Sequence, residues 1–147
     1  MSKVRETSKA RALVRAVIER EDGSVEELVT HNLITTVGRE WRARRIAGDS
    51  AEPIGLIAAG TDDTEEALGD ASLGDELDRV GIQEFERDGN EVNFEAVFEE
   101  GVATGSWREL GVLSDDPEND LISRVTFDVI NKGSSDVVRV VWTYIFE

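Results

Sequence analysis

Alternating apolar and polar side chains run through most of this chain, in short segments separated by turns. The clearest case is 91–98, where Val92, Phe94, Ala96 and Phe98 fall on one parity. A two-residue period places such side chains on one face of a β-strand. Asp88-Gly89-Asn90 lies just before this segment and is typical of a hairpin turn. The region 80–100 is therefore predicted to form two antiparallel strands.

The same pattern recurs along the chain. Residues 12–20 and 25–30 alternate around Asp22-Gly23, which predicts a second hairpin. Further strands are expected at 54–60, 104–114, 121–130 and 137–146. About eight short strands at this spacing are typical of a sandwich or barrel. The sequence thus predicts a mainly β, antiparallel β-sandwich in one domain at 10–147, after a flexible N-terminus at 1–9.

One segment changes its period. Residues 35–48 predict the only main α-helix, with Thr35 or Thr36 as the N-cap and Gly48 as the C-cap. Its apolar stripe is thin, so we expect the helix to cover one side or one end of a sheet. Trp142 lies on the apolar parity of the last strand and is expected in the core or at a subunit contact, whereas the face of Trp107 is ambiguous.

The stretch from Ile54 to Arg79 begins as an apolar strand and becomes rich in glycine, threonine and acids. We expect a solvated acidic loop at 61–72 and one helical turn at 71–79, because Leu73 and Leu77 are four residues apart. Arg79 could then pair with Glu76 or with Asp75. This stretch is interpreted as a connector with a structural role.

The charge balance is strongly acidic. Asp and Glu number 32 against 16 Lys and Arg, which gives a formal net charge of −16. This composition argues against a broad surface for nucleic acid or for an anionic membrane, both of which need clustered cations. It fits an ordinary acidic domain, and it also fits a halophilic protein whose self-repulsion is screened by molar salt. We favour the halophilic interpretation.

Several kinds of chemistry have no support in the sequence. Cysteine is absent, so disulfides, thiolate metal sites and cysteine nucleophiles are excluded. No apolar run could span a bilayer, and the first residues lack a signal-peptide pattern, so we expect synthesis in the cytoplasm without membrane insertion. His31 is the only histidine and no serine lies in a GxSxG motif, which makes a Ser-His-Asp triad improbable.

Carboxylates are too numerous to identify a catalytic pair by spacing. Residues 62–70 and 115–120 offer oxygen ligands for Ca²⁺, but neither matches an EF-hand loop, and solvated acidic loops are the simpler interpretation. No glycine motif for phosphate binding is present. The sequence therefore assigns no catalytic, cofactor-binding or metal-binding residue, and we expect no enzyme activity and no cofactor.

Several short motifs follow one another across residues 30–146. They begin with Asn32-Leu33-Ile34 and Pro53-Ile54, and continue with Ala59-Gly60-Thr61 and Thr64. The later members are Asp70, Leu73, Glu76 and Arg79, then Gly105 and Arg108-Glu109-Leu110-Gly111-Val112, then Leu121-Ile122-Ser123-Arg124, and finally Val140, Trp142 and Thr143. In order and spacing, the chain resembles a family of small tail-associated proteins of tailed phages and archaeal tailed viruses. The loop after Gly60 is more acidic than the family pattern.

The resemblance implies a structural virion protein of the tail tip, baseplate or tail fibre, in a haloarchaeal virus, which could also contribute to host attachment. Its expected partners are copies of itself in a symmetric homo-oligomer, with a trimer favoured, together with other virion proteins and a host surface receptor. The alternative is a capsid decoration or turret protein of the virus head. An enzyme or carbohydrate-binding domain is the third hypothesis, which a deep pocket with two carboxylates of raised pKa would favour.

Overall fold

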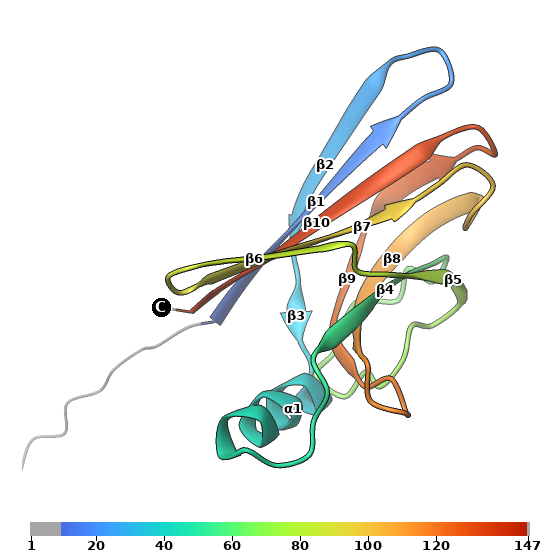
Figure 1. The fold of residues 1–147 in the computed structure, drawn as a ribbon. Coiled ribbons are helices and arrows are strands. Elements are labelled where there is room, and N and C mark those ends of the chain that lie inside the picture. Colours follow the sequence, from blue (N-terminus) through green and yellow to red (C-terminus); the bar gives the residue numbers. More distant parts are fainter. Residues whose placement is uncertain (1–9, 147) are drawn as a thin grey trace, which may run out of the picture.

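The computed structural model describes residues 10–146, so the predicted flexible N-terminus at 1–9 lies outside the described residues. Within them, the chain forms two antiparallel five-stranded sheets and one helix (Figure 1). Sheet A has the order β2-β1-β10-β7-β6. Its strands are β1 (Ala10–Glu19), β2 (Val25–His31), β6 (Glu84–Asp88), β7 (Glu91–Phe98) and β10 (Val137–Phe146). The predicted all-β sandwich is confirmed.

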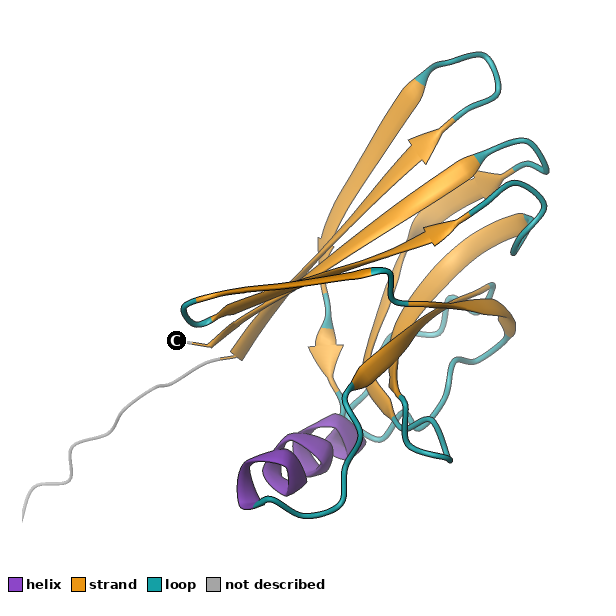
Figure 2. Ribbon diagram, in the orientation of Figure 1, coloured by secondary structure: helices purple, strands orange, loops and turns teal. Residues whose placement is uncertain are grey.

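Sheet B has the order β3-β9-β8-β4-β5. Its strands are β3 (Leu33–Ile34), β4 (Ile54–Gly60), β5 (Glu76–Gly81), β8 (Gly105–Ser114) and β9 (Leu121–Lys132). The helix α1 (Thr36–Ala47) lies at one end of the sandwich, beside β9 (Figures 1 and 2). This position agrees with the expectation from its thin apolar stripe.

The core lies between the inner faces of the two sheets. Trp107 of β8 and Trp142 of β10 are both fully buried, which confirms the prediction for Trp142 and resolves the ambiguity of Trp107. Phe98 packs edge-on against Trp107 with ring centroids 4.7 Å apart. A hydrogen bond between the hydroxyls of Ser123 and Tyr144 joins sheet B to sheet A. Burial of each of these large aromatic side chains stabilises the fold by about 2 kcal/mol.

The helix caps follow the predicted chemistry. The Thr35 hydroxyl oxygen accepts a hydrogen bond from the Gly38 N–H at 2.9 Å and donates its own hydrogen to the Leu121 carbonyl at 2.6 Å. Gly48 ends the helix with φ of 75°, in the left-handed region that favours glycine. Gly38 also allows close packing, since a Cβ there would lie 2.1 Å from the Ile122 carbonyl oxygen. The capping residue therefore fixes both the helix start and its contact with β9.

Two details differ from the sequence predictions. Residues 71–79 do not form a helical turn, because β5 begins at Glu76 and continues to Gly81. The region 80–100 does not belong to a single sheet either: β5 pairs with β4 in sheet B, whereas β6 pairs with β7 in sheet A. The chain crosses between the sheets at Ile82 and Gln83. With the short β3, this gives ten strands within residues 10–146 where about eight were predicted.

Candidate functional site

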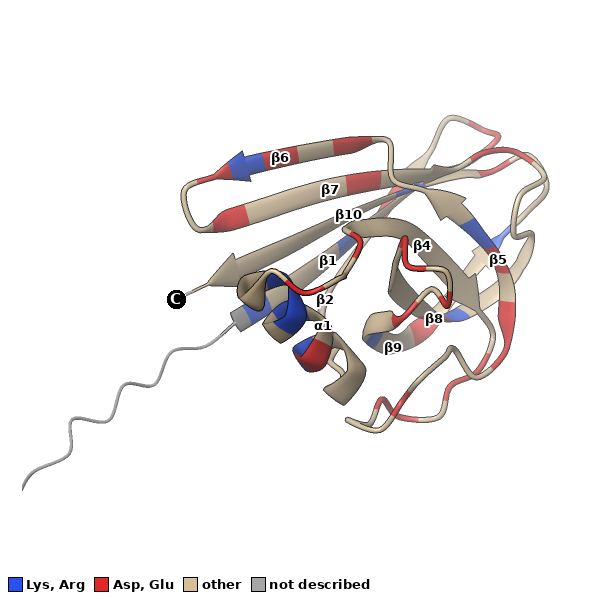
Figure 3. Ribbon diagram, turned by 60° about the horizontal axis from the view of Figure 1, so that its bottom comes forward, with Lys and Arg blue, Asp and Glu red and all other residues tan. Residues whose placement is uncertain are grey.

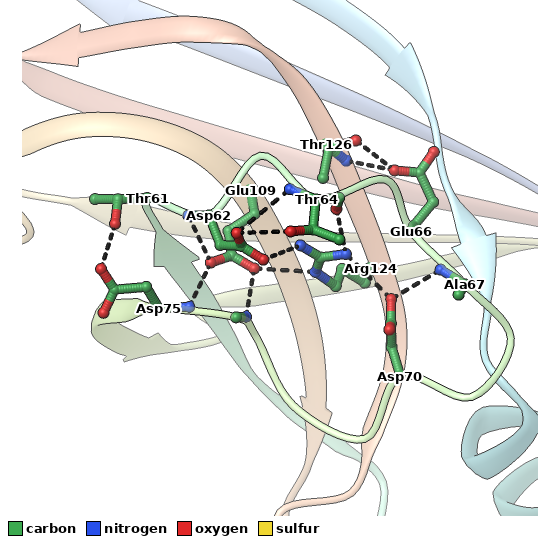
Figure 4. A network of polar contacts seen from close by, with 11 residues as sticks. Thr61, Asp62, Thr64, Glu66, Ala67, Asp70, Asp75, Glu109, Arg124 and Thr126 are labelled. Carbon is green, nitrogen blue, oxygen red and sulfur yellow. Dashed lines mark hydrogen bonds and ion pairs between the residues drawn. The ribbon is translucent and has the colours of Figure 1, made fainter.

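Residues 61–75, which we call the loop cover, pack on part of the outer face of sheet B (Figure 4). Leu73 of the loop cover is 7% exposed and packs in a cluster with Ala58, Leu113 and Leu121 of sheet B. Gly111 makes room for it, because a Cβ at that position would lie 2.8 Å from the Leu73 Cδ2 atom. The loop is therefore part of the folded structure, although its composition predicted a solvated connector.

An ion pair on sheet B fixes the loop cover in place. Arg124 of β9 and Glu109 of β8 lie side by side, with 3.0 Å between Nε and Oε1, and their side chains are 3% and 0% exposed. The Glu109 carboxylate accepts hydrogen bonds from the backbone N–H groups of Gly74 and Asp75, each at 2.8 Å, and of Asp62 at 3.0 Å. These are charge-assisted bonds to backbone donors, which the loop would otherwise leave unsatisfied.

Arg124 holds the other half of the loop cover. Its guanidinium donates to Asp70 at 3.1 Å, to Asp62 at 3.2 Å and to the Thr64 carbonyl at 2.9 Å (Figure 4). Burial lowers the pKa of Arg124, but hydrogen bonds and attraction from Glu109 and Asp70 outweigh burial and raise the pKa above its ordinary value. The expectation that the acids of this loop stay solvated is thus wrong for Asp62 and Asp70.

The polar side chains at the C-terminal end of the loop cover form one of the predicted ion pairs. Arg79 pairs with Glu76 at 2.8 Å, which was one of the two expected pairings. The hydroxyl of Thr61 donates to the Asp75 carboxylate. No group of three or more acidic or histidine side chains in residues 10–146 is arranged to hold a metal ion. Acidic side chains of the two segments 62–70 and 115–120 form hydrogen bonds and ion pairs within the protein. One example is the ion pair between Arg44 and Asp120, with 2.8 Å between nitrogen and oxygen.

The outer face of sheet A carries many aliphatic side chains, and no helix or loop of residues 10–146 packs across it (Figure 1). We call it the aliphatic face. Strand register places the following side chains on it: Leu13, Val17, Val25, Val29, Val97, Val137, Val141 and Ile145. Val25 and Val29 are 63% and 60% exposed. The same register places polar side chains among them: Arg139 at the centre of the face pairs with Glu19 at 3.0 Å and with Glu95 at 3.5 Å, so aliphatic and charged side chains share this face.

Charge divides the aliphatic face into two flanks. On the β6–β7 flank all the charged side chains that point outward are acidic: Glu84, Glu86, Asp88, Glu91 and Glu95. The opposite flank, formed by β2 and β1, carries both signs: Arg11 and Arg15 are exposed cations, Arg15 pairs with Glu27 at 2.8 Å, and Glu19 pairs with Arg139 at 3.0 Å. His31 is exposed on the same face, opposite Leu13.

A third surface lies at the open end of the sandwich, between α1 and the ends of β6, β7 and β10. This groove of about 300 Å³ is lined by Trp41, Arg45, Pro53, Phe85, Tyr144 and Phe146, among others, and we call it the aromatic groove. Arg42 lies over the Phe146 ring at 5.8 Å and Arg45 over the Trp41 ring at 5.9 Å. Neither arginine forms an ion pair within residues 10–146. Tryptophan, tyrosine and arginine are the residue types that most often dominate protein–protein contacts.

The fold and these surfaces define a small antiparallel β-sandwich in which a loop covers part of one outer face and no element of residues 10–146 covers the other. Comparison with protein-family models, with curated proteins and with solved structures gives no match. No helix of the described residues is long and apolar enough to span a membrane. Several residues that carry the sequence resemblance, including Gly60, Asp70, Leu73, Glu109 and Arg124, meet in the loop cover and its ion pair.

Proposed function

We propose that this protein is a structural subunit of a tailed virion, part of the tail tip, baseplate or tail fibre, and that copies of it assemble through the aliphatic face. The observation that carries the proposal is the uncovered aliphatic surface on sheet A. Isolated monomers rarely leave such a surface in water, because burying it releases about 25 cal/mol for each Å². The resemblance to tail-associated proteins supports the location in the tail.

The size of the face suits a subunit contact. Five strands spaced about 4.8 Å apart, each with about eight residues of rise near 3.4 Å, give a surface of roughly 650 Å². A stable interface buries about 800 Å² on each partner, so the face together with its protruding side chains approaches that size. Contacts at the β-turns around the rim would extend it further.

The charge distribution favours a cyclic arrangement. When copies turn their aliphatic faces toward one axis parallel to the strands, the β2 edge of each copy meets the β6 edge of the next. The exposed cations Arg11 and Arg15 of β1, one strand in from the β2 edge, then lie on the side that faces the acidic row with Glu84 and Glu86. Such heterologous contacts close into a ring. The trimer predicted from the resemblance is one ring that brings these two edges together.

Sedimentation velocity in molar KCl tests the assembly. The unmodified chain should sediment as a trimer, whereas Val141→Lys should sediment as a monomer, because removing a charged side chain from water at the centre of the interface costs several kcal/mol, even beside Glu95. Val129→Lys on β9 is the matched control, with the same change at a position 39% exposed, and should remain trimeric. A trimer that survives Val141→Lys would contradict the proposed contact.

Antibody labelling of intact particles tests the location. Label at the tail supports the proposal, whereas label distributed over the head would favour the decoration or turret alternative. Absence of the protein from particles would overturn both.

A further inference from the structure

The aromatic groove and the loop cover are complementary surfaces on one molecule. Arg45 lines the groove and Arg42 lies at its edge over the Phe146 ring, in a chain whose net charge is −16. The Arg45 guanidinium also donates a hydrogen bond to the Ala51 carbonyl at 2.8 Å.

The loop cover presents Leu68, which is 48% exposed. Asp63 and Glu65, five and three residues before it, are exposed and form no ion pair within residues 10–146, whereas Asp70 after it already pairs with Arg124. An aliphatic side chain that follows free carboxylates is the chemistry that an aromatic groove with a cationic rim would bind.

These two surfaces cannot meet within one molecule. The Leu68 carbonyl accepts a hydrogen bond from the Thr36 N–H at 2.8 Å, which places Leu68 beside the first residue of α1. Arg45 of the groove lies in the last turn of the same helix, whose 12 residues span about 18 Å. Arg124 and Glu109 hold the loop cover against sheet B, so Leu68 cannot swing across that distance.

We propose that the aromatic groove binds the segment around Leu68 of a second copy of this chain. The contact is heterologous, because each copy offers its groove to one neighbour and its Leu68 segment to another, so it links copies in a ring or row. Figure 3 shows the cations of α1 and the acids of the surrounding loops from this end of the molecule. The inference rests on the proposed assembly of many copies but uses a surface other than the aliphatic face.

Disulfide cross-linking tests this contact directly, since the natural chain has no cysteine. A chain with Ala67→Cys, next to Leu68, is mixed with a chain carrying Ile46→Cys, which is 81% exposed beside the two groove arginines. Mild oxidation in molar KCl should give a disulfide-linked pair of the two variants. Val129→Cys on β9 replaces Ile46→Cys as the control. An equal yield with this control would overturn the proposal.

Charge reversal provides an independent test. Arg42→Glu/Arg45→Glu in the Ile46→Cys chain should lower the yield of the linked pair about tenfold at low salt, as expected for the loss of close charge pairs. Asp63→Arg/Glu65→Arg in the Ala67→Cys chain should restore it. Arg39→Glu, on the same helix but outside the groove, should have little effect. An unchanged yield in the charge-reversed pair would contradict the contact, and circular dichroism verifies that each variant is folded.

The two proposals fail in different ways. Groove variants should leave the trimer in sedimentation velocity intact, because that trimer depends on the aliphatic face. Conversely, Val141→Lys should abolish the trimer and still permit the cross-link. A groove variant that abolishes the trimer would contradict the assignment of separate surfaces.

Discussion

The outer faces of sheet B and of sheet A both carry apolar side chains, yet only on sheet B does a loop of the same chain cover part of them. On sheet B, Leu73 and the loop cover exclude water from Leu113 and Leu121. On sheet A, Val25 and Val29 remain exposed. The comparison shows that a sandwich can cover part of one outer face with its own loop and leave the other outer face exposed. It also explains why the loop is long: it replaces a third layer over sheet B.

The polar groups of the two faces differ in the same way. Arg124 and Glu109 are buried, and their charges are matched by further carboxylates and backbone N–H groups (Figure 4). Arg15 and Glu27 on sheet A form an ion pair with side chains about half exposed, at 55% and 46%. Exposed pairs contribute about 0–1 kcal/mol, whereas breaking a buried pair costs about 3–5 kcal/mol. The same chemical pair should therefore have very different effects on the two faces.

The largest expected effect comes from removing one partner of the buried pair. Arg124→Ala should lower the free energy of unfolding by about 3–5 kcal/mol, because Glu109 is left buried without its cation. Arg15→Ala is the matched change on sheet A and should cost about 1 kcal/mol or less. Urea unfolding of the two variants measures both values. Equal losses would show that the loop cover is not held by the ion pair.

A second comparison concerns the apolar side chains. Leu73→Ala should cost about 2–3 kcal/mol, because it leaves a cavity between the loop cover and sheet B. Val29→Ala on sheet A should change the stability of the monomer by about 0.5 kcal/mol or less, because Val29 is exposed there. Thermal unfolding at low protein concentration measures the loss of stability in each of the two variants. A large loss for Val29→Ala would mean that this side chain is already buried in the monomer.

Salt should act on the two faces unequally. The acids of the β6–β7 flank are exposed, and at ~1 M salt the Debye length falls to about 3 Å, so their repulsion is screened. The melting temperature and the trimer fraction should rise steeply from dilute buffer to molar KCl, as the net charge of −16 predicts. The cost of Arg124→Ala should change little, since this pair is shielded from solvent. Melting curves that stay flat across this range would reject the halophilic interpretation.

The smallest effect concerns the turns at the end of sheet A. Asp136 accepts hydrogen bonds from the Gly133 N–H at 2.7 Å and from Arg20 at 2.8 Å. These two interactions, the backbone bond first, hold the pKa of Asp136 below its ordinary value. Its carboxylate therefore stabilises the fold above about pH 4, the ordinary range of an unfolded aspartate, and this contribution is lost as the pH falls through the lower folded pKa.

Asp136→Asn should accordingly lower the free energy of unfolding at neutral pH. The difference in this free energy between the variant and the unmodified chain should shrink as the pH approaches 3. Urea unfolding at several pH values measures this trend. A difference that grows on acidification would have the wrong sign and would contradict the role of Asp136.

Local sequence rules predicted much of this fold. Alternation located the hairpins around Asp22-Gly23 and Asp88-Gly89, and capping chemistry placed the helix within one residue at each end. These features depend on neighbours in the chain, which a sequence displays directly. The crossing between sheets at Ile82 and Gln83 was missed, because the side chains on both sides of it keep an alternating pattern.

The buried pair was also missed, although the sequence contains a signal for it. Glu109 in "WRELGVL" and Arg124 in "LISRVTF" are opposite charges inside otherwise apolar strands. Such residues are rarely buried unless they are paired, so two of them could have been expected to meet. The helical spacing of Leu73 and Leu77 was misleading for a physical reason: Glu109 accepts the backbone N–H groups of Gly74 and Asp75, which fixes a non-helical path.

Thiol labelling of single-cysteine chains tests the central claim, that copies of the chain cover the aliphatic face. Val29→Cys and the control Val129→Cys are compared as dilute monomers and as assembled protein in molar KCl. The cysteine at position 29 should react rapidly in the monomer and much more slowly in the assembly, whereas the cysteine at position 129 should react at a similar rate in both. Equal reactivity of position 29 in the two states would contradict the account.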